Sequence, residues 1–256
     1  MNLFSLFRVE LVKIRRSRIF WILLIPALMM WLPSGFNAEV NFRMDTYGVP
    51  PEYNYFIQGY MGMAWFMIPA TLIVCTVLLN QTERANNGIL KCLALPVSTG
   101  RLSLAKFLVA VLLTFEQLAL SIAAYYVSAV LASRLYEYDF ILPFPYVCRA
   151  ASLIYFAALP MAAVFWMLSV LIQTPIFSVG LGLASAVPSV LVLNTEIWYC
   201  YPMVYPFYVL MTEYGKMAEG IFDTEVQLFP LLPIAVIVTI VCLLIACLRF
   251  GAAERR

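Results

Sequence analysis

The chain has 256 residues, of which 64% are hydrophobic and 12% are charged, and its mean hydropathy is +0.90. A water-soluble domain carries about 25% charged and 45–50% apolar residues, so folding in water would leave too much apolar surface uncovered. This composition excludes a soluble domain and indicates an integral membrane protein. The net charge of +2 gives no reason to expect nucleic-acid binding, because the basic residues gather in loops that orient membrane helices.

The amino-terminal stretch predicts a moderately amphipathic helix. Within residues 2–16, several apolar side chains share one helical arc and basic residues lie at or beyond its edge. This helix could equally be a plain anchor in the inner leaflet that supplies positive charge. The arc consists of Leu3, Phe4, Phe7, Leu11 and Ile14, and the basic residues are Arg8, Arg15 and Arg16.

Long apolar runs occupy most of the remaining chain. A spanning helix needs roughly 20 mostly apolar residues, and the alternation of a barrel strand is absent. The sequence therefore predicts an all-α membrane protein with six transmembrane helices. We expect them at residues 19–32, 59–79, 107–132, 146–172, 176–193 and 230–248.

The distribution of basic residues predicts the orientation. Most of the 16 lysines and arginines lie before the first span, between the second and third spans, or after the last. Lysine and arginine are enriched in cytoplasmic loops. Both termini are therefore predicted to be cytoplasmic.

The connection between the second and third spans predicts a short surface helix over residues 83–95. Glu83 near its start would suit the positive end of the helix dipole, and Pro96 would stop it. Arg101 and Lys106 mark the return of the chain into the bilayer. This segment is either a solvated connector with charges for topology or a docking helix for a cytoplasmic motor. Its apolar face is formed by Ile89, Leu90, Leu93 and Ala94.

Residues 194–229 are aromatic, broken by proline and too interrupted to span. Tyrosine and tryptophan favour the membrane interface, so this segment is predicted to lie at the outer surface. It is either a simple aromatic belt or part of a gate. Cys148 and Cys200 could meet on this side, although most such cysteines are plain small hydrophobes.

Two features inside the predicted spans are candidates for packing or function. The pairs Gly180/Ala184 and Gly182/Ala186 allow close helix approach, more plausibly within the subunit than between subunits. Glu116 and Gln117 lie near the middle of the third span, where a charge is costly unless it faces protein or water. They either form a structural hydrogen bond or line a translocation path.

The sequence lacks the G-x-x-x-x-G-K-[ST] loop that cradles nucleotides. It also has no histidine and no C-x-x-C pair, so we expect no transition-metal site. The chain is therefore not expected to be an enzyme or to carry a cofactor of its own.

The pattern Glu83…Asn87-Gly88-Ile89-Leu90…Leu93…Pro96-Val97-Ser98…Arg101…Lys106 resembles the cytoplasmic signature of ABC-2 type transporter permeases. In that family a similar stretch forms the coupling helix that contacts the ATPase. Here Gly88-Ile89 replaces the usual Gly-Thr, and Thr99-Gly100 separates the usual Ser-Arg pair. The resemblance implies ATPase-coupling roles for Glu83, Gly88, Leu90, Leu93, Pro96 and Arg101.

The same resemblance implies roles for three other regions. Residues 1–18 would form an amphipathic elbow helix, and 194–229 would hold re-entrant helices that close an outer gate. Glu116 and Gln117 are the candidates for the translocation path. The candidate gate residues are Trp198, Tyr201, Tyr205 and Phe207.

The small size most resembles the permease subunits of lantibiotic immunity and bacitracin resistance. That implies one ABC-2 transmembrane domain over residues 1–256, in a bacterial cytoplasmic membrane. It would export a hydrophobic or amphipathic substrate, such as a lantibiotic-type peptide. The implied partners are two copies of an ATPase, which bind ATP and Mg²⁺, a second related permease, and lipid. Two alternatives remain: an ATP-independent secondary transporter that needs Glu116, and a non-transporting sensor or scaffold subunit.

Overall fold

The computed structural model describes residues 2–15, 19–43, 48–84, 98–218 and 225–250, and within them every regular element is a helix. In chain order the elements are α1 (Leu3–Arg15), α2 (Ile19–Phe36), α3 (Val40–Arg43), α4 (Pro51–Gly62), η2 (Met63–Met67), α5 (Ile68–Arg84), α7 (Thr99–Tyr136), α8 (Phe144–Ala157), α9 (Leu159–Leu171), α10 (Pro175–Ala186), α11 (Ser189–Val192), η4 (Trp198–Cys200), η5 (Pro202–Val204), α12 (Tyr205–Gly215) and α13 (Leu228–Arg249).

Six helical segments of the described chain are long and apolar enough to cross a membrane. Each coincides with one predicted span, so the prediction of six transmembrane helices is confirmed and the chain is a multi-pass membrane protein. The segments are Ile19–Phe36, Pro51–Gln81, Thr99–Tyr136, Phe144–Leu171, Pro175–Val192 and Leu228–Arg249.

Two of these segments are interrupted near prolines. In the second span, the Ile68 N–H bonds to the Met63 carbonyl, which closes a π-helical turn directly before Pro69. In the fourth span, α8 ends at Ala157 and α9 begins at Leu159, one residue before Pro160. Proline has no N–H for the helical ladder, and such local changes of helix type accommodate its missing hydrogen bond.

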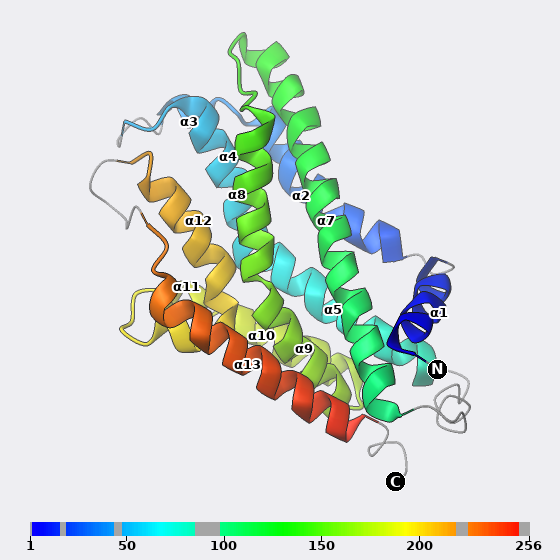
Figure 1. The fold of residues 1–256 in the computed structure, drawn as a ribbon. Coiled ribbons are helices and arrows are strands. Elements are labelled where there is room, and N and C mark those ends of the chain that lie inside the picture. Colours follow the sequence, from blue (N-terminus) through cyan, green and yellow to red (C-terminus); the bar gives the residue numbers. More distant parts are fainter. Residues whose placement is uncertain (1, 16–18, 44–47, 85–97, 219–224, 251–256) are drawn as a thin grey trace.

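The long helix α7 is the centre of the arrangement (Figure 1), because it contacts α1, α2, α5, α8, α9 and α13. Beside it, α13 packs along α9, α10 along α5, and α12 along α8. The helix α1, the end of α5, the start of α7 and the end of α13 lie at one end of the bundle (Figure 1), which we call the α1 end. The basic residues predict that this end is cytoplasmic.

A cluster of aromatic rings holds α2, α4 and α7 together, toward the end of the bundle opposite the α1 end. Trp31 meets Tyr60 and Tyr125 edge-on, with ring centroids 5.3 and 5.1 Å apart. Its indole N–H donates to the Ser121 hydroxyl over 3.4 Å, and Ser121 bonds to the Tyr60 hydroxyl over 3.2 Å. Edge-to-face contacts suit the charge distribution of aromatic rings, and the hydrogen bonds satisfy polar groups that water cannot reach.

The two small-residue pairs of α10 face different surroundings. Gly182 and Ala186 are buried, and a Cβ atom at Gly182 would lie 2.4 Å from Cγ1 of Ile73 on α5. A Cβ atom at Gly180 would meet no atom within 4 Å, and Ala184 is exposed. The pair Gly182/Ala186 therefore packs within the subunit, while the other pair faces outward.

We expect Gly182→Ala to destabilise the protein, because its methyl group would push α10 away from Ile73. Overpacking of this kind costs about 1–3 kcal/mol. Gly180→Ala in the same helix is the matched control, and it should leave the unfolding temperature unchanged or slightly higher. Thermal unfolding in detergent measures both, and equal shifts would contradict the packing described here.

Candidate coupling site at the start of α7

The residues predicted to couple to an ATPase fall only partly within the described structure. Glu83 lies in the last turn of α5, and Arg101 is exposed in the first turn of α7. Gly88, Leu90, Leu93 and Pro96 lie outside the described residues. The structure therefore shows the two helix ends that flank the predicted coupling helix.

Glu83 is part of α5, which continues to Arg84; the rest of the predicted coupling helix lies outside the described residues, so that helix stays a prediction. Asn80 lies within α5 and is buried, and its amide donates to the Ser169 carbonyl of α9 over 2.5 Å. No glycine or proline between Asn80 and Arg84 stops the helix.

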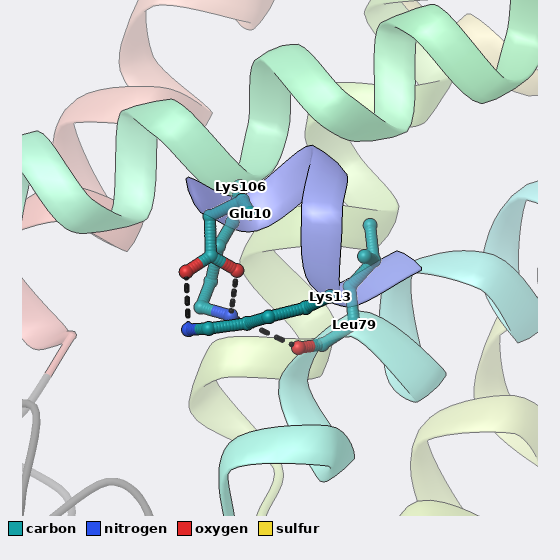
Figure 2. Close-up of polar contacts among 4 residues, drawn as sticks. All are labelled: Glu10, Lys13, Leu79 and Lys106. Carbon is teal, nitrogen blue, oxygen red and sulfur yellow. Dashed lines mark hydrogen bonds and ion pairs between the residues drawn. The ribbon is translucent and has the colours of Figure 1, made fainter. Parts of the chain in front are cut away.

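A buried lysine joins three elements at the α1 end. Lys106 lies two turns into α7 and is fully buried, with 0% of its side chain exposed. Its ammonium donates to Oε2 of Glu10 on α1 over 2.9 Å and to the carbonyl of Leu79 on α5 over 3.2 Å. Figure 2 shows these contacts converging from α1, α5 and α7. The two helices that flank residues 85–97 are thereby tied to each other and to α1.

The carboxylate of Glu10 is itself shared between two lysines. Glu10 is only 3% exposed, and its Oε1 atom accepts a hydrogen bond from Lys13 over 2.6 Å (Figure 2). Lys13 is 40% exposed, so it reaches the carboxylate from the surface. Removing one partner of a buried ion pair costs about 3–5 kcal/mol because the other charge is left uncompensated.

Two further helices hold the same two turns of α7. Trp166 of α9 donates its indole N–H to the Ser103 hydroxyl over 3.1 Å. The thiol of Cys247 on α13 donates to the Gly100 carbonyl over 3.4 Å. We call Gly100, Ser103 and Lys106 with these partners the α7 junction; it connects α7 to α1, α5, α9 and α13.

Sequence reasoning missed the central pair of this junction. Glu10 was not singled out, and Lys106 was interpreted as a charge marking the return to the bilayer and as the last residue of the family pattern, with no partner foreseen. The packed face of α1 also differs from the predicted arc, because Leu6 is buried at 5% exposure while Phe4 is 76% exposed. In the structure, Glu10 lies one helical turn after Leu6 on the face that packs, but the sequence alone does not show which face that is.

The neighbours Glu116 and Gln117 face different surroundings. Gln117 is fully buried, and its amide nitrogen donates to the Thr71 hydroxyl of α5 over 3.0 Å. Glu116 instead lines a groove beside α1 and α2. The structural hydrogen bond expected of this pair is therefore made by Gln117 alone, and a translocation role for either residue stays a prediction.

The four predicted gate residues pack at the far side of the bundle. Trp198 stacks on Tyr208 with ring centroids 4.0 Å apart, and the Tyr201 hydroxyl donates to the Ser185 carbonyl of α10. Tyr205 and Phe207 are buried in α12, which lies along α8. Burial raises the pKa of Tyr205 to about 12, which keeps its hydroxyl a donor to the Tyr199 carbonyl. A gating role for these residues stays a prediction.

A second buried carboxylate, Glu213 on α12, was assigned only to an outer loop by the sequence. It is fully buried and pairs with Arg149 of α8 at 3.4 Å and with Lys216 one turn on. This pair ties α12 to α8. Cys148 and Cys200, which could have formed a disulfide, are both free thiols.

A family model for ABC-2 family transporter proteins matches residues 6–189, which is more than two thirds of the chain. The chain belongs to the ABC-2 transporter family. Proteins of this family are non-catalytic membrane permeases that typically work with an ATPase partner. The matched region contains all of the α7 junction except Cys247. No curated protein matches this ABC-2 family member.

We expect Lys106→Met to lower the stability of the permease by at most about 3–5 kcal/mol, because Glu10 would lose its buried partner and keep only the partly exposed Lys13. The double variant Lys106→Met with Glu10→Gln should lose less than the two single variants together. Lys13→Met is the matched control and should have a small effect, since Lys13 is partly exposed. Thermal unfolding of the four variants in detergent tests this, and strictly additive losses would show that the pair is not coupled.

Proposed function

We propose that this permease is the membrane subunit of an ATP-driven exporter and that the α7 junction receives the mechanical work of the ATPase. The observation that carries the proposal is the set of contacts made by the first two turns of α7. These two turns follow residues 85–97 in the chain, and they bond to α1, α5, α9 and α13. A load applied to the predicted coupling helix at 83–95 would reach all four elements through these contacts.

The proposed transmission is rigid-body movement. The Lys106 bond to the Leu79 carbonyl ties the ends of α5 and α7 together. At its other end α7 contacts α2, where the Tyr136 hydroxyl donates to the Phe36 carbonyl over 2.5 Å. Because α7 is one continuous helix of 38 residues, a displacement of its first turns would also move α2 at the opposite end.

The finer features of the exporter belong to the same proposal. We infer two copies of the ATPase that bind ATP and Mg²⁺, a second related permease, and residence in a bacterial cytoplasmic membrane. The cargo is a hydrophobic or amphipathic substrate moved outward, such as a lantibiotic-type peptide. Support comes from the family match, the six spans and the basic residues that the sequence places before the first span, between the second and third spans and after the last.

Co-purification tests the docking surface. The full chain is expressed with its neighbouring genes, purified in mild detergent, and its stoichiometric partners are identified by mass spectrometry. We expect two ATPase copies and a second permease, and we expect Leu90→Asp with Leu93→Asp to release the ATPase by placing charges on the docking face. Leu135→Asp is the control, because Leu135 is exposed at the opposite end of α7.

Two results would count against the proposal. If the ATPase stays bound to the double Asp variant, docking does not depend on residues 83–95. If the chain purifies without any ATPase under every condition, the exporter proposal fails, and a secondary transporter or a sensor subunit becomes the better account.

Work transfer through the junction is tested separately from docking. Glu10→Gln should keep the ATPase bound but reduce the stimulation of ATP hydrolysis by the permease in vesicles, because α1 and α7 would no longer be joined by charge. Lys13→Gln leaves the Glu10–Lys106 pair in place and serves as the control. Equal ATPase stimulation by the wild type and Glu10→Gln would remove the junction from the mechanism.

A further inference from the structure

The side chain of Glu116 lines a groove of about 300 Å³ at the meeting point of three helices. Every other described residue that lines this groove is apolar. Leu11 and Ile14 come from α1, Phe20 comes from α2, and Val109, Leu112 and Leu113 come from α7. Phe20 and Leu112 are 46% and 42% exposed, so the groove opens on the outer surface of the bundle. In a membrane protein that surface faces lipid.

The Glu116 carboxylate has no counter-charge within the part of the chain that the structure describes, where it makes neither a hydrogen bond nor an ion pair. The two carboxylates buried elsewhere differ: Glu10 and Glu213 each hold two cationic side chains. Glu116 lies ten residues beyond Lys106, or about 15 Å along α7. This distance is about half the thickness of the hydrocarbon core. An unpaired charge inside that core is costly.

A second groove, wholly apolar, lies on the other side of Leu112. Its volume is about 570 Å³, and it is lined by Leu3, Phe4 and Phe7 of α1 and by Leu108, Val111, Leu112 and Phe115 of α7. Only the Leu112 side chain is shared by the two grooves. The two grooves meet at Leu112, and we call the carboxylate-bearing groove with its apolar neighbour the α1–α7 track.

We propose that this track binds an amphipathic organic cation taken from the membrane, with its ammonium group on Glu116 and its apolar chain along α1 and α7. Charge complementarity selects a cation, and the apolar walls select a hydrocarbon or aromatic chain. An anionic phospholipid fits poorly, because its phosphate would be repelled by the Glu116 carboxylate. The ligand is the cargo class of the exporter, so this step rests on the proposed function.

The position of α1 connects this site to the α7 junction. Leu11 in the groove wall directly follows Glu10, and Ile14 directly follows Lys13. One helix therefore carries both the wall of the binding track and the carboxylate that holds Lys106. A ligand that moves α1 would act on the ion pair at Lys106, and a movement of the junction would act on the track.

Photolabelling of the full complex in phosphatidylcholine–phosphatidylglycerol vesicles tests the site. The probe is a dodecylamine that carries a diazirine on its chain, and the matched dodecanol diazirine is the neutral probe. We expect the amine to label residues of α1 and of 108–116, and Glu116→Gln to reduce that labelling about tenfold, as loss of a charge partner does. Glu137→Gln, at the exposed far end of α7, should leave labelling unchanged.

Three results would overturn the assignment. The first is equal amine labelling of wild type and Glu116→Gln, and the second is equal labelling by the alcohol probe with the same dependence on Glu116. The third is a phospholipid retained by the wild type and lost from Glu116→Gln in native mass spectrometry. ATPase co-purification and ATP-driven movement of the amine are measured on the same samples. If Glu116→Gln loses labelling but still moves the amine with ATP, the site is rejected and the exporter function is kept. If the wild type is labelled but ATP does not drive movement of the amine, the exporter function is rejected and the site is kept.

Discussion

The ammonium of Lys106 is buried where water cannot reach it, and the position of the neighbouring helices depends on that fact. Its charge is met by Glu10 of α1 and by the Leu79 carbonyl of α5. Sliding α1 by one helical turn, about 5.4 Å, would break the Glu10–Lys106 pair and leave the Lys106 ammonium buried without its carboxylate. A well-packed apolar pair could be equally stable, but it would tolerate such sliding. The ion pair therefore specifies one register between α1 and α7.

The need to give every buried polar group a partner also determines how the rest of α7 packs. Its inward face carries Thr114, Gln117, Ser121 and Ser128 at spacings of three, four and seven residues, and all four are buried. Each bonds to a backbone carbonyl or to a polar group on another helix, as Gln117 does with Thr71 and Ser128 with the Trp31 carbonyl. Polar groups inside a membrane protein must be satisfied internally, so this face fixes the positions of α2 and α5 around α7.

The spans could be predicted from the sequence because the length of an apolar run is a property of the chain alone. The Glu10–Lys106 pair could not be predicted, since its members are 96 positions apart and meet only through packing. Periodicity gave α1 an apolar arc, but which side packs depends on its neighbour, so Leu6 is buried and Phe4 is exposed. The helix at 83–95 was predicted from its own residues and its coupling role from a family resemblance, and its central residues lie outside the described structure.

The length of α7 has a consequence for the lipids around the protein. Its 38 residues extend about 57 Å, whereas the hydrocarbon core measures about 30 Å. The helix must therefore tilt, protrude, or do both, and hydrophobic mismatch with the bilayer influences which. Lipids with longer acyl chains would reduce the tilt of α7, and lipids with shorter acyl chains would increase it. Membrane thickness thus becomes a variable that changes the angle at which the junction meets the rest of the bundle.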